Sequence, residues 1–224
     1  MKALLTALAA SAIFIATASA DWVIESKIES PQLNSATTTK VKGDKLRVDI
    51  PSGPVGAMSS IVDTKTGDAI QLVHSQKMAV KTGSEQLKAA MEAAKQKAGI
   101  KGASSAELKP TGQSEKVGDY DCDVYTWSDG STTSKLWVAK NHPQAAALKA
   151  FEKQMKSGIL GGMQVGPDTS TLPGPTIKTE TTTQGMTVTN TITSIKEQDV
   201  DAKEFEVPAD YQTMQLPAAP PSGK

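Results

Sequence analysis

The sequence predicts an α+β protein in which an antiparallel β-sheet carries two amphipathic helices. Two observations support this fold class. Apolar and polar residues alternate with a period of two in many short segments, and turn residues separate these segments about every ten residues. In two longer segments, residues 84–98 and 143–157, apolar residues recur every three or four positions, which is the period of a helix.

The N-terminal segment has the layout of a secretory signal peptide. Lys2 provides the basic region, residues 3–15 form an apolar stretch, and Ala18, Ser19 and Ala20 form a small-residue cleavage site. The apolar stretch is shorter than a typical transmembrane helix. We therefore expect cleavage after Ala20, a periplasmic or secreted protein, and no stable membrane anchor after cleavage.

Beyond the signal peptide at residues 1–20 we expect one domain, residues 21–215, and a disordered tail at residues 216–224. The whole chain has 24 Lys and Arg residues and 24 Asp and Glu residues, so it carries no excess charge. A chain without a basic excess has no electrostatic reason to bind nucleic acid. We expect a monomer.

The first half of the domain is predicted to be a meander of short antiparallel strands. Alternating polar and apolar residues define most of them, and turn residues such as Gly43 and Gly67 lie between them. The predicted strands are residues 22–29, 33–42, 45–50, 59–63, 69–75 and 78–81.

The first predicted helix covers residues 84–98. Thr82 and Glu85 have the spacing of a capping box, and Gly99 provides a C-terminal stop. The exposed face would carry Lys, Glu and Gln, so one apolar face is expected to pack on the sheet.

The second predicted helix begins at Pro143, whose missing N–H is tolerated in the first turn. Leu148, Phe151 and Met155 give it an apolar stripe, and Gly158 ends it. Residues 159–175 follow and are rich in glycine and proline, so we expect a flexible loop there. Two threonine-rich strands within residues 176–195 and an apolar patch at residues 205–211 are expected to complete the domain.

Residues 118–140 have the clearest hairpin pattern and contain Cys122, the only cysteine. A chain with one cysteine cannot form an intramolecular disulfide. We expect Cys122 to be a small buried side chain, and the alternatives are an intermolecular disulfide or a reactive thiol.

No catalytic motif is recognisable in the chain. Residues 119–123 contain three aspartates at the spacing that opens a calcium-binding loop, but Val124 stands where that loop requires glycine. His74 and His142 are the only histidines, and neither has a partner at the spacing of a zinc site. Nucleophile-elbow, zinc-protease and phosphate-loop motifs are absent. We therefore expect a non-enzymatic protein without a metal ion or other cofactor.

Four segments resemble a family of exported bacterial proteins that is defined only as a domain of unknown function. They are SSIVD-x-x-x-GD at residues 59–68, GDYDCDVYTW at 118–127, LWVAK at 136–140 and F-x-V-P-x-x-Y at 205–211. The resemblance implies a half-barrel similar to the lipoprotein carriers and receptors of the LolA/LolB type. In this fold a curved antiparallel sheet holds the two helices on its concave face, and in the carriers the cavity binds acyl chains. No matching lipid-releasing arginine or apolar membrane-inserting loop is recognisable here.

The predicted function is that of an extracytoplasmic binding or carrier protein for an apolar, lipid-like ligand. Nine apolar residues are expected to line its cavity: Ile24, Leu46, Val48, Leu72, Met91, Leu148, Phe151, Val188 and Ile192. The same side chains also fit a core without a cavity. The alternative function is a cell-envelope structural or protein-interaction module, which would use the polar strands or the loop at residues 159–175.

Overall fold

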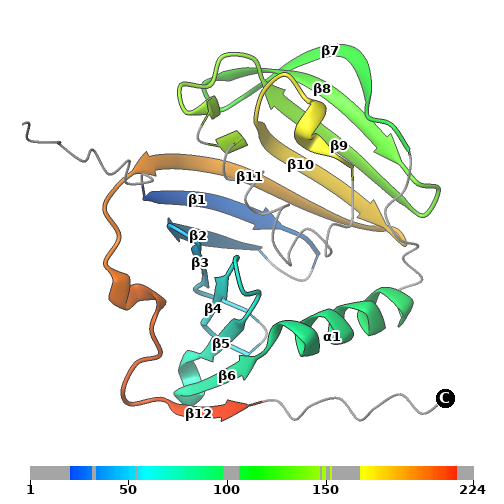
Figure 1. Ribbon diagram of the computed structural model, residues 1–224. Helices are drawn as coiled ribbons and strands as arrows, with labels where there is room; N and C mark the ends of the chain where they lie inside the picture. The colour runs from blue at the N-terminus through cyan, green and yellow to red at the C-terminus, as the bar shows by residue number, and fades with distance from the viewer. Residues whose placement is uncertain are drawn as a thin grey trace, which may run out of the picture.

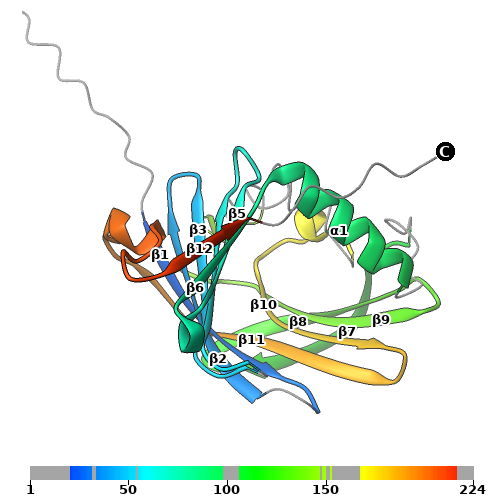
Figure 2. The same cartoon turned by 90° about the horizontal axis from the view of Figure 1, so that it is seen from below.

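The computed structural model describes residues 21–31, 34–53, 55–97, 106–146, 148–149, 152 and 167–215. These residues form one twelve-stranded sheet with one continuous α-helix and short 3-10 helices. The sheet curves into an open arch, and the α-helix spans the open side of this arch (Figure 2). The predicted signal peptide at residues 1–20 and the predicted tail at residues 216–224 lie outside the described residues.

The strands follow one another along the chain with few interruptions (Figure 1). They are β1 (Trp22–Glu29), β2 (Asn34–Lys42), β3 (Lys45–Ile50), β4 (Met58–Asp63), β5 (Ala69–Val73), β6 (Met78–Thr82), β7 (Lys109–Val117), β8 (Tyr120–Ser128), β9 (Thr132–Ala139), β10 (Thr176–Thr183), β11 (Met186–Glu197) and β12 (Gln212–Gln215). The helices are α1 (Ser84–Lys97) and the 3-10 helices η1 (His74–Gln76), η3 (Thr169–Thr171) and η4 (Ala202–Phe205).

The strand order is β12-β6-β5-β4-β3-β2-β1-β11-β10-β9-β8-β7. The two halves of the chain therefore meet where β1 pairs with β11, side by side in the middle of the sheet (Figure 1). Neighbouring strands are antiparallel except for β12, which runs parallel to β6 at one edge. Strand β7 forms the opposite edge.

The predicted α+β fold class, with two amphipathic helices on the sheet, is wrong. The described residues form a mixed sheet of twelve strands with α1 as their one continuous α-helix. Within the second predicted helix, at residues 143–157, the described residues 145–146, 148–149 and 152 are helical, and the Leu148 N–H donates to the Gln144 carbonyl (3.0 Å). The sheet is larger than predicted because polar segments form its edges, where a strand needs no apolar face.

The N-terminal cap of helix α1 lies one residue later than the sequence predicted. The Gly83 N–H donates to Gln86 Oε1 (3.2 Å), and the Leu87 N–H donates to the Gly83 carbonyl (2.9 Å). This is one half of a capping box, with Gly83 at the cap position and Gln86 three residues on, because glycine has no side chain to accept the second bond. The predicted pair of Thr82 and Glu85 is therefore displaced by one position.

Strand β1 separates two buried clusters on opposite faces of the sheet. Ile24 belongs to one cluster, whereas Val23 packs against the other, which contains Leu72. Consecutive residues of a strand point to opposite faces, so these clusters lie on either side of the sheet. The C-terminal segment, residues 198–211, covers the Leu72 side with Val200 and Phe205. In Figure 2, η4 accordingly lies on the outer side of the arch, away from α1.

The described part of the predicted loop at residues 159–175 contributes to a third cluster. Leu172, directly after η3, is buried and packs with Leu136 and Val138 of β9. No helix among the described residues is long and apolar enough to cross a membrane.

Candidate functional site

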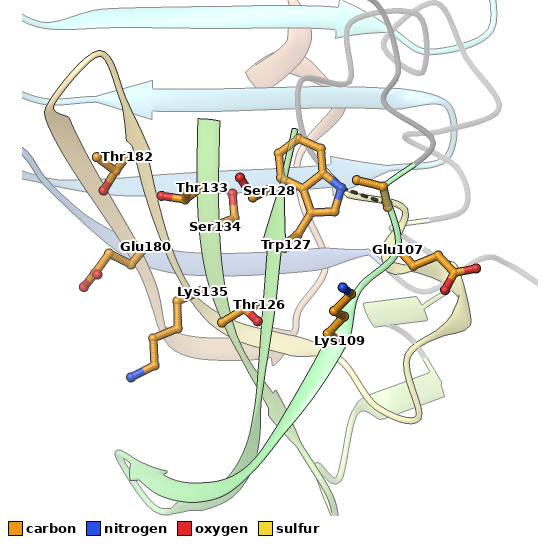
Figure 3. A pocket seen from close by; sticks show the side chains of 11 residues that line it. Glu107, Lys109, Thr126, Trp127, Ser128, Thr133, Ser134, Lys135, Glu180 and Thr182 are labelled. Carbon is orange, nitrogen blue, oxygen red and sulfur yellow. Dashed lines mark hydrogen bonds between the residues drawn. The ribbon is translucent and has the colours of Figure 1, made fainter. Parts of the chain in front are cut away.

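A pocket with a volume of about 450 Å³ lies where residues 106–109 pass strands β8, β9 and β10 (Figure 3). Its lining is mainly charged and hydroxyl-bearing, with two apolar contributors, Ala106 and Trp127. The lining residues are Ala106, Glu107, Lys109, Thr126, Trp127, Ser128, Thr133, Ser134, Lys135, Glu180 and Thr182.

The antiparallel register explains how residues far apart in sequence meet in this pocket. Lys109 pairs with Thr126, Thr126 with Lys135, and Lys135 with Glu180, so these four residues form one row across β7, β8, β9 and β10. A second row contains the pairs Ser128–Thr133 and Thr133–Thr182. The two rows are two residues apart along each strand, so their side chains share one face of the sheet.

The turn between β8 and β9 fixes one end of the pocket. Asp129 accepts hydrogen bonds from the N–H groups of Ser131 (2.9 Å) and Thr132 (2.7 Å), and Gly130 adopts a φ of 92°. A side chain with a Cβ rarely tolerates this conformation, so glycine is the suitable residue there. The hydrogen bonds from the Thr132 and Ser131 backbone hold the pKa of Asp129 below its ordinary value. The turn is thus stabilised in the ionised form of Asp129.

Trp127 attaches the segment before β7 to the sheet. Its indole N–H donates to the Ala106 carbonyl (3.0 Å; dashed line in Figure 3), and its side chain is buried. This bond connects residues 21 positions apart and satisfies the only polar group of the indole ring. Trp127 therefore holds Ala106 and Glu107 at the rim of the pocket.

Lys135 is the one lysine of the pocket with a carboxylate partner among the described residues. Its ammonium group lies 3.0 Å from Glu115 Oε1 and 4.6 Å from the centre of the Trp137 ring. The Trp137 indole N–H donates to Glu115 Oε2 (2.7 Å). The hydrogen bonds from Trp137 and Lys135 keep the pKa of Glu115 below its ordinary value. Lys135 is consequently held in place and partly neutralised.

Five other polar side chains of the pocket have free hydrogen-bonding capacity. Within the described part of the chain, Glu107, Lys109, Thr126, Thr133 and Glu180 make no side-chain hydrogen bond or ion pair. Lys109, Thr126 and Thr133 are exposed and Glu180 is half-buried. A ligand can therefore bind to these groups without breaking an existing interaction.

The nine predicted cavity residues do not gather at this pocket. Ile24, Leu148 and Ile192 meet in one buried cluster, and Leu72 lies in the cluster on the opposite face of the sheet. Val188 is 43% exposed. Leu46 is buried and Val48 half-buried, both on β3. The side chain of Met91 and the whole of Phe151 lie outside the described residues, and the cavity-lining role of all nine residues stays a prediction.

A second polar network surrounds His74, which the sequence placed in a strand and the structure places at the start of η1. His74 Nε2 lies 2.7 Å from Ser59 Oγ, and His74 Nδ1 lies 2.6 Å from the Tyr211 hydroxyl. Ser59 Oγ donates to Asp49 Oδ1, and Arg47 Nε donates to the same oxygen (2.6 Å). Since the only hydroxyl proton of Ser59 is used by Asp49, His74 Nε2 carries the proton it shares with Ser59.

The network around His74 is partly buried and connects parts of the fold. Ser59 is 1% exposed, so a substrate cannot reach its hydroxyl group. Arg47 also donates to the Glu204 carbonyl (2.6 Å), and Lys40 pairs with the Glu204 carboxylate (3.0 Å). The network therefore attaches the C-terminal segment to strands β2, β3 and β4. Sequence reasoning missed it because its members are dispersed along the chain and meet only through strand pairing.

A second pocket, of about 400 Å³, lies between the β2–β3 turn and η4. Its lysines already have partners, because Lys42 pairs with Asp21 and Lys45 lies 4.0 Å from Asp63. Asp63 also accepts the N–H groups of the turn that follows it. Among the described residues, no group of three or more His, Cys, Asp or Glu side chains could hold a metal ion.

Comparison with solved structures gives weak likenesses. PNGF-II in a P21 crystal form has a TM-score of 0.43 and 14% identity over 88% of this chain, which spans 31% of the length of PNGF-II. The Mycobacterium tuberculosis lipoprotein LppX has a TM-score of 0.43 and 7% identity, over 81% of this chain and 88% of LppX. No curated protein matches the chain in sequence. The model of the family described as domain of unknown function DUF4412 matches residues 22–211, and the chain belongs to this family.

Proposed function

We propose that the protein is a non-enzymatic, extracytoplasmic binding protein for a small amphiphilic ligand, and that the pocket beside Trp127 holds the polar part of this ligand. One observation carries the proposal. The pocket places five polar side chains that have no partner in the described part of the chain around a volume of about 450 Å³. Pockets for small molecules typically measure about 300–1,000 Å³.

The composition of the pocket favours binding over catalysis. Its described lining contains no histidine or cysteine, and its carboxylates, Glu107 and Glu180, come from separate segments of the chain. Hydroxyl, ammonium and carboxylate groups around an open pocket are suited to hydrogen bonding with a polar ligand. Ala106 adds an apolar group at the rim, where the buried Trp127 holds it, and this suits an amphiphile better than a purely polar molecule.

The location outside the cytoplasm is supported by the N-terminal sequence, where a basic residue, an apolar stretch and Ala18-Ser19-Ala20 follow one another as in exported precursors. The proposed ligand is still the lipid-like molecule expected from the sequence, but only its polar part is assigned to this pocket. Charged and hydroxyl-bearing side chains surround the pocket, so its occupant is proposed to be the polar end of the amphiphile.

The test is mass spectrometry of organic extracts from the purified protein, compared with a variant whose pocket is filled. Thr133→Trp places a large side chain at an exposed lining position, and Thr213→Trp makes the same change on β12, outside the pocket. We expect an amphiphile to co-purify with the wild type and the Thr213 variant and to be lost from the Thr133 variant. Equal amounts in all three proteins, or none in any, would refute the proposal.

The alternative function, a protein-interaction module, is favoured by strand β7. This strand forms an edge of the sheet, and eight of its nine residues are exposed. An edge strand presents unpaired N–H and C=O groups that can pair with an extended segment of another protein. Cross-linking from Gln113 on this edge in cell-envelope extracts would identify such a partner, and the absence of any cross-linked protein would remove this alternative.

A further inference from the structure

We infer that the polar part of the ligand is zwitterionic, with its anionic group held over Thr126 and its cationic group at Glu180. This inference rests on the binding function proposed above and specifies the chemical class of the ligand. It follows from the order of the charged and hydroxyl groups along one row of the sheet.

The anionic group has a subsite made of two ammonium groups and one hydroxyl group that can donate. Lys109 on β7 and Lys135 on β9 are the two direct cross-strand neighbours of Thr126 on β8. Figure 3 shows them on either side of Thr126. Adjacent strands are about 4.8 Å apart, so the Lys109 ammonium group can reach an oxygen anion placed over the Thr126 hydroxyl. Lys135, held by Glu115 and Trp137, adds its partly neutralised charge from the other side. Ammonium groups have no acceptor, which makes this part of the row selective for a carboxylate or phosphate group.

The charge of this subsite is limited to about one unit. Lys135 is already paired with Glu115 (3.0 Å), whereas Lys109 has no ion pair in the described part of the chain. The carboxylate of Glu107 points away from Thr126 in Figure 3. One uncompensated lysine charge matches a monoanion, such as a phosphate diester.

The cationic group has the next position along the same row. Glu180 on β10 is the cross-strand neighbour of Lys135, and it has no partner among the described residues. An ionised carboxylate only accepts hydrogen bonds, so it favours an ammonium group or another strong donor. Thr126 and Glu180 are two strand spacings apart, about 10 Å along the sheet. The flexible side chain of Glu180, which points away from Thr126 in Figure 3, turns towards it when the ligand binds.

Phosphoethanolamine and phosphocholine groups carry the required pair of charges across a short two-carbon linker. A purely anionic head group would leave Glu180 beside a like charge, and a purely cationic one would meet Lys109. Each of these contacts would be unfavourable at this separation. A zwitterion matches both ends of the row and is therefore the class of ligand that the row selects.

The test is isothermal titration of the purified protein with three probes that share one alkyl chain: dodecylphosphocholine, dodecyl phosphate and dodecyl maltoside, each below its critical micelle concentration. Free phosphocholine is the fourth probe and distinguishes a lipid from a small soluble zwitterion. We expect dodecylphosphocholine to bind about two- to fivefold more tightly than either other detergent, which is the effect of a solvent-accessible charge pair.

Lys109→Gln and Glu180→Gln should each weaken dodecylphosphocholine binding by about two- to fivefold. Lys116→Gln on β7 and Glu25→Gln on β1 change the same residue types at exposed positions outside the pocket and should have no effect. If the three detergents bind equally and neither pocket variant changes their affinity, the pocket does not select a zwitterionic head group. The proposed binding of an amphiphile would remain intact. No binding of any detergent to the wild type would refute the proposed function itself.

Discussion

Replacing Arg47 by alanine is expected to destabilise the protein by about 3 kcal/mol, because one side chain connects three partners. Arg47 donates to Asp49 (2.6 Å), to Ser59 (3.1 Å) and to the Glu204 carbonyl (2.6 Å), and its side chain is only 14% exposed. A hydrogen bond to a charged group contributes about 1.5–3 kcal/mol. The three bonds share one guanidinium group and are not additive, so the expected total is near the value for breaking one buried ion pair.

The free energy of unfolding, measured by urea denaturation with tryptophan fluorescence, checks this expectation. Lys45→Ala is the control on the same strand, because the Lys45–Asp63 pair is 4.0 Å apart and its lysine side chain is 53% exposed. That variant should lose less than about 0.5 kcal/mol. A loss below about 1 kcal/mol in Arg47→Ala would show that the network does not hold the C-terminal segment.

The same variant has an expected pH dependence. Burial alone would raise the pKa of Asp49, but hydrogen bonds from Ser59 and Arg47 outweigh it and lower the pKa below the ordinary 3.8. A lowered pKa contributes stability above the unfolded value, and this contribution is lost as the pH falls through the folded value. Without Arg47 the lowering decreases, so the stability difference between wild type and variant should be largest near neutral pH and shrink towards pH 3. A stability difference that stays constant between neutral pH and pH 3 would show that Arg47 does not lower the pKa of Asp49.

Three further predictions concern buried groups. Tyr211→Phe removes the hydroxyl that lies 2.6 Å from His74 Nδ1 and should cost about 1 kcal/mol in urea denaturation, with an unchanged stability counting against that contact. Leu72→Ala empties a fully buried position and should cost about 2–5 kcal/mol in the same assay, and a cost below 1 kcal/mol would disagree with its burial. Burial raises the pKa of the Cys122 thiol, so a thiol reagent at neutral pH should react only after unfolding, and rapid labelling of the native protein would refute this.

The sequence predicted those elements whose local pattern is independent of the rest of the chain. Strands β1 and β3 have the predicted bounds, because one of their faces is apolar and the other polar. Cys122 is buried, as predicted. Helix α1 was also predicted closely, because side chains in a strand alternate with a period of two, and an apolar period of three to four residues fits only a helix. Membership of a family defined as a domain of unknown function is confirmed as well.

Features that depend on pairing with distant segments were not predictable. Strand β7 is polar along its length and becomes a strand because β8 offers it a partner. β12 has four exposed residues and exists through its parallel pairing with β6. A short polar segment has no period that distinguishes a strand from a loop. Of the second predicted helix, residues 145–146, 148–149 and 152 are helical, and residues 147, 150–151 and 153–157 lie outside the described part of the chain.

The pocket was missed for the same reason. Its residues lie on four separate segments, and their common feature is the register that aligns Lys109, Thr126, Lys135 and Glu180. The signal available in the sequence was the turn at residues 128–131, which sets the pairing of β8 with β9. The sequence pattern indicated apolar positions instead, and several of these, such as Leu72 and Ile24, are packed in the core.

Binding of an amphiphile beside Trp127 is tested most directly by nuclear magnetic resonance of the tryptophan indole groups. The protein labelled with nitrogen-15 would be titrated with dodecylphosphocholine below its critical micelle concentration. Because the Trp127 indole N–H bonds to Ala106 at the pocket rim, its resonance should shift and saturate, while that of Trp22 on β1 stays in place. A Trp127 resonance that does not move while the detergent is bound would contradict the proposed site.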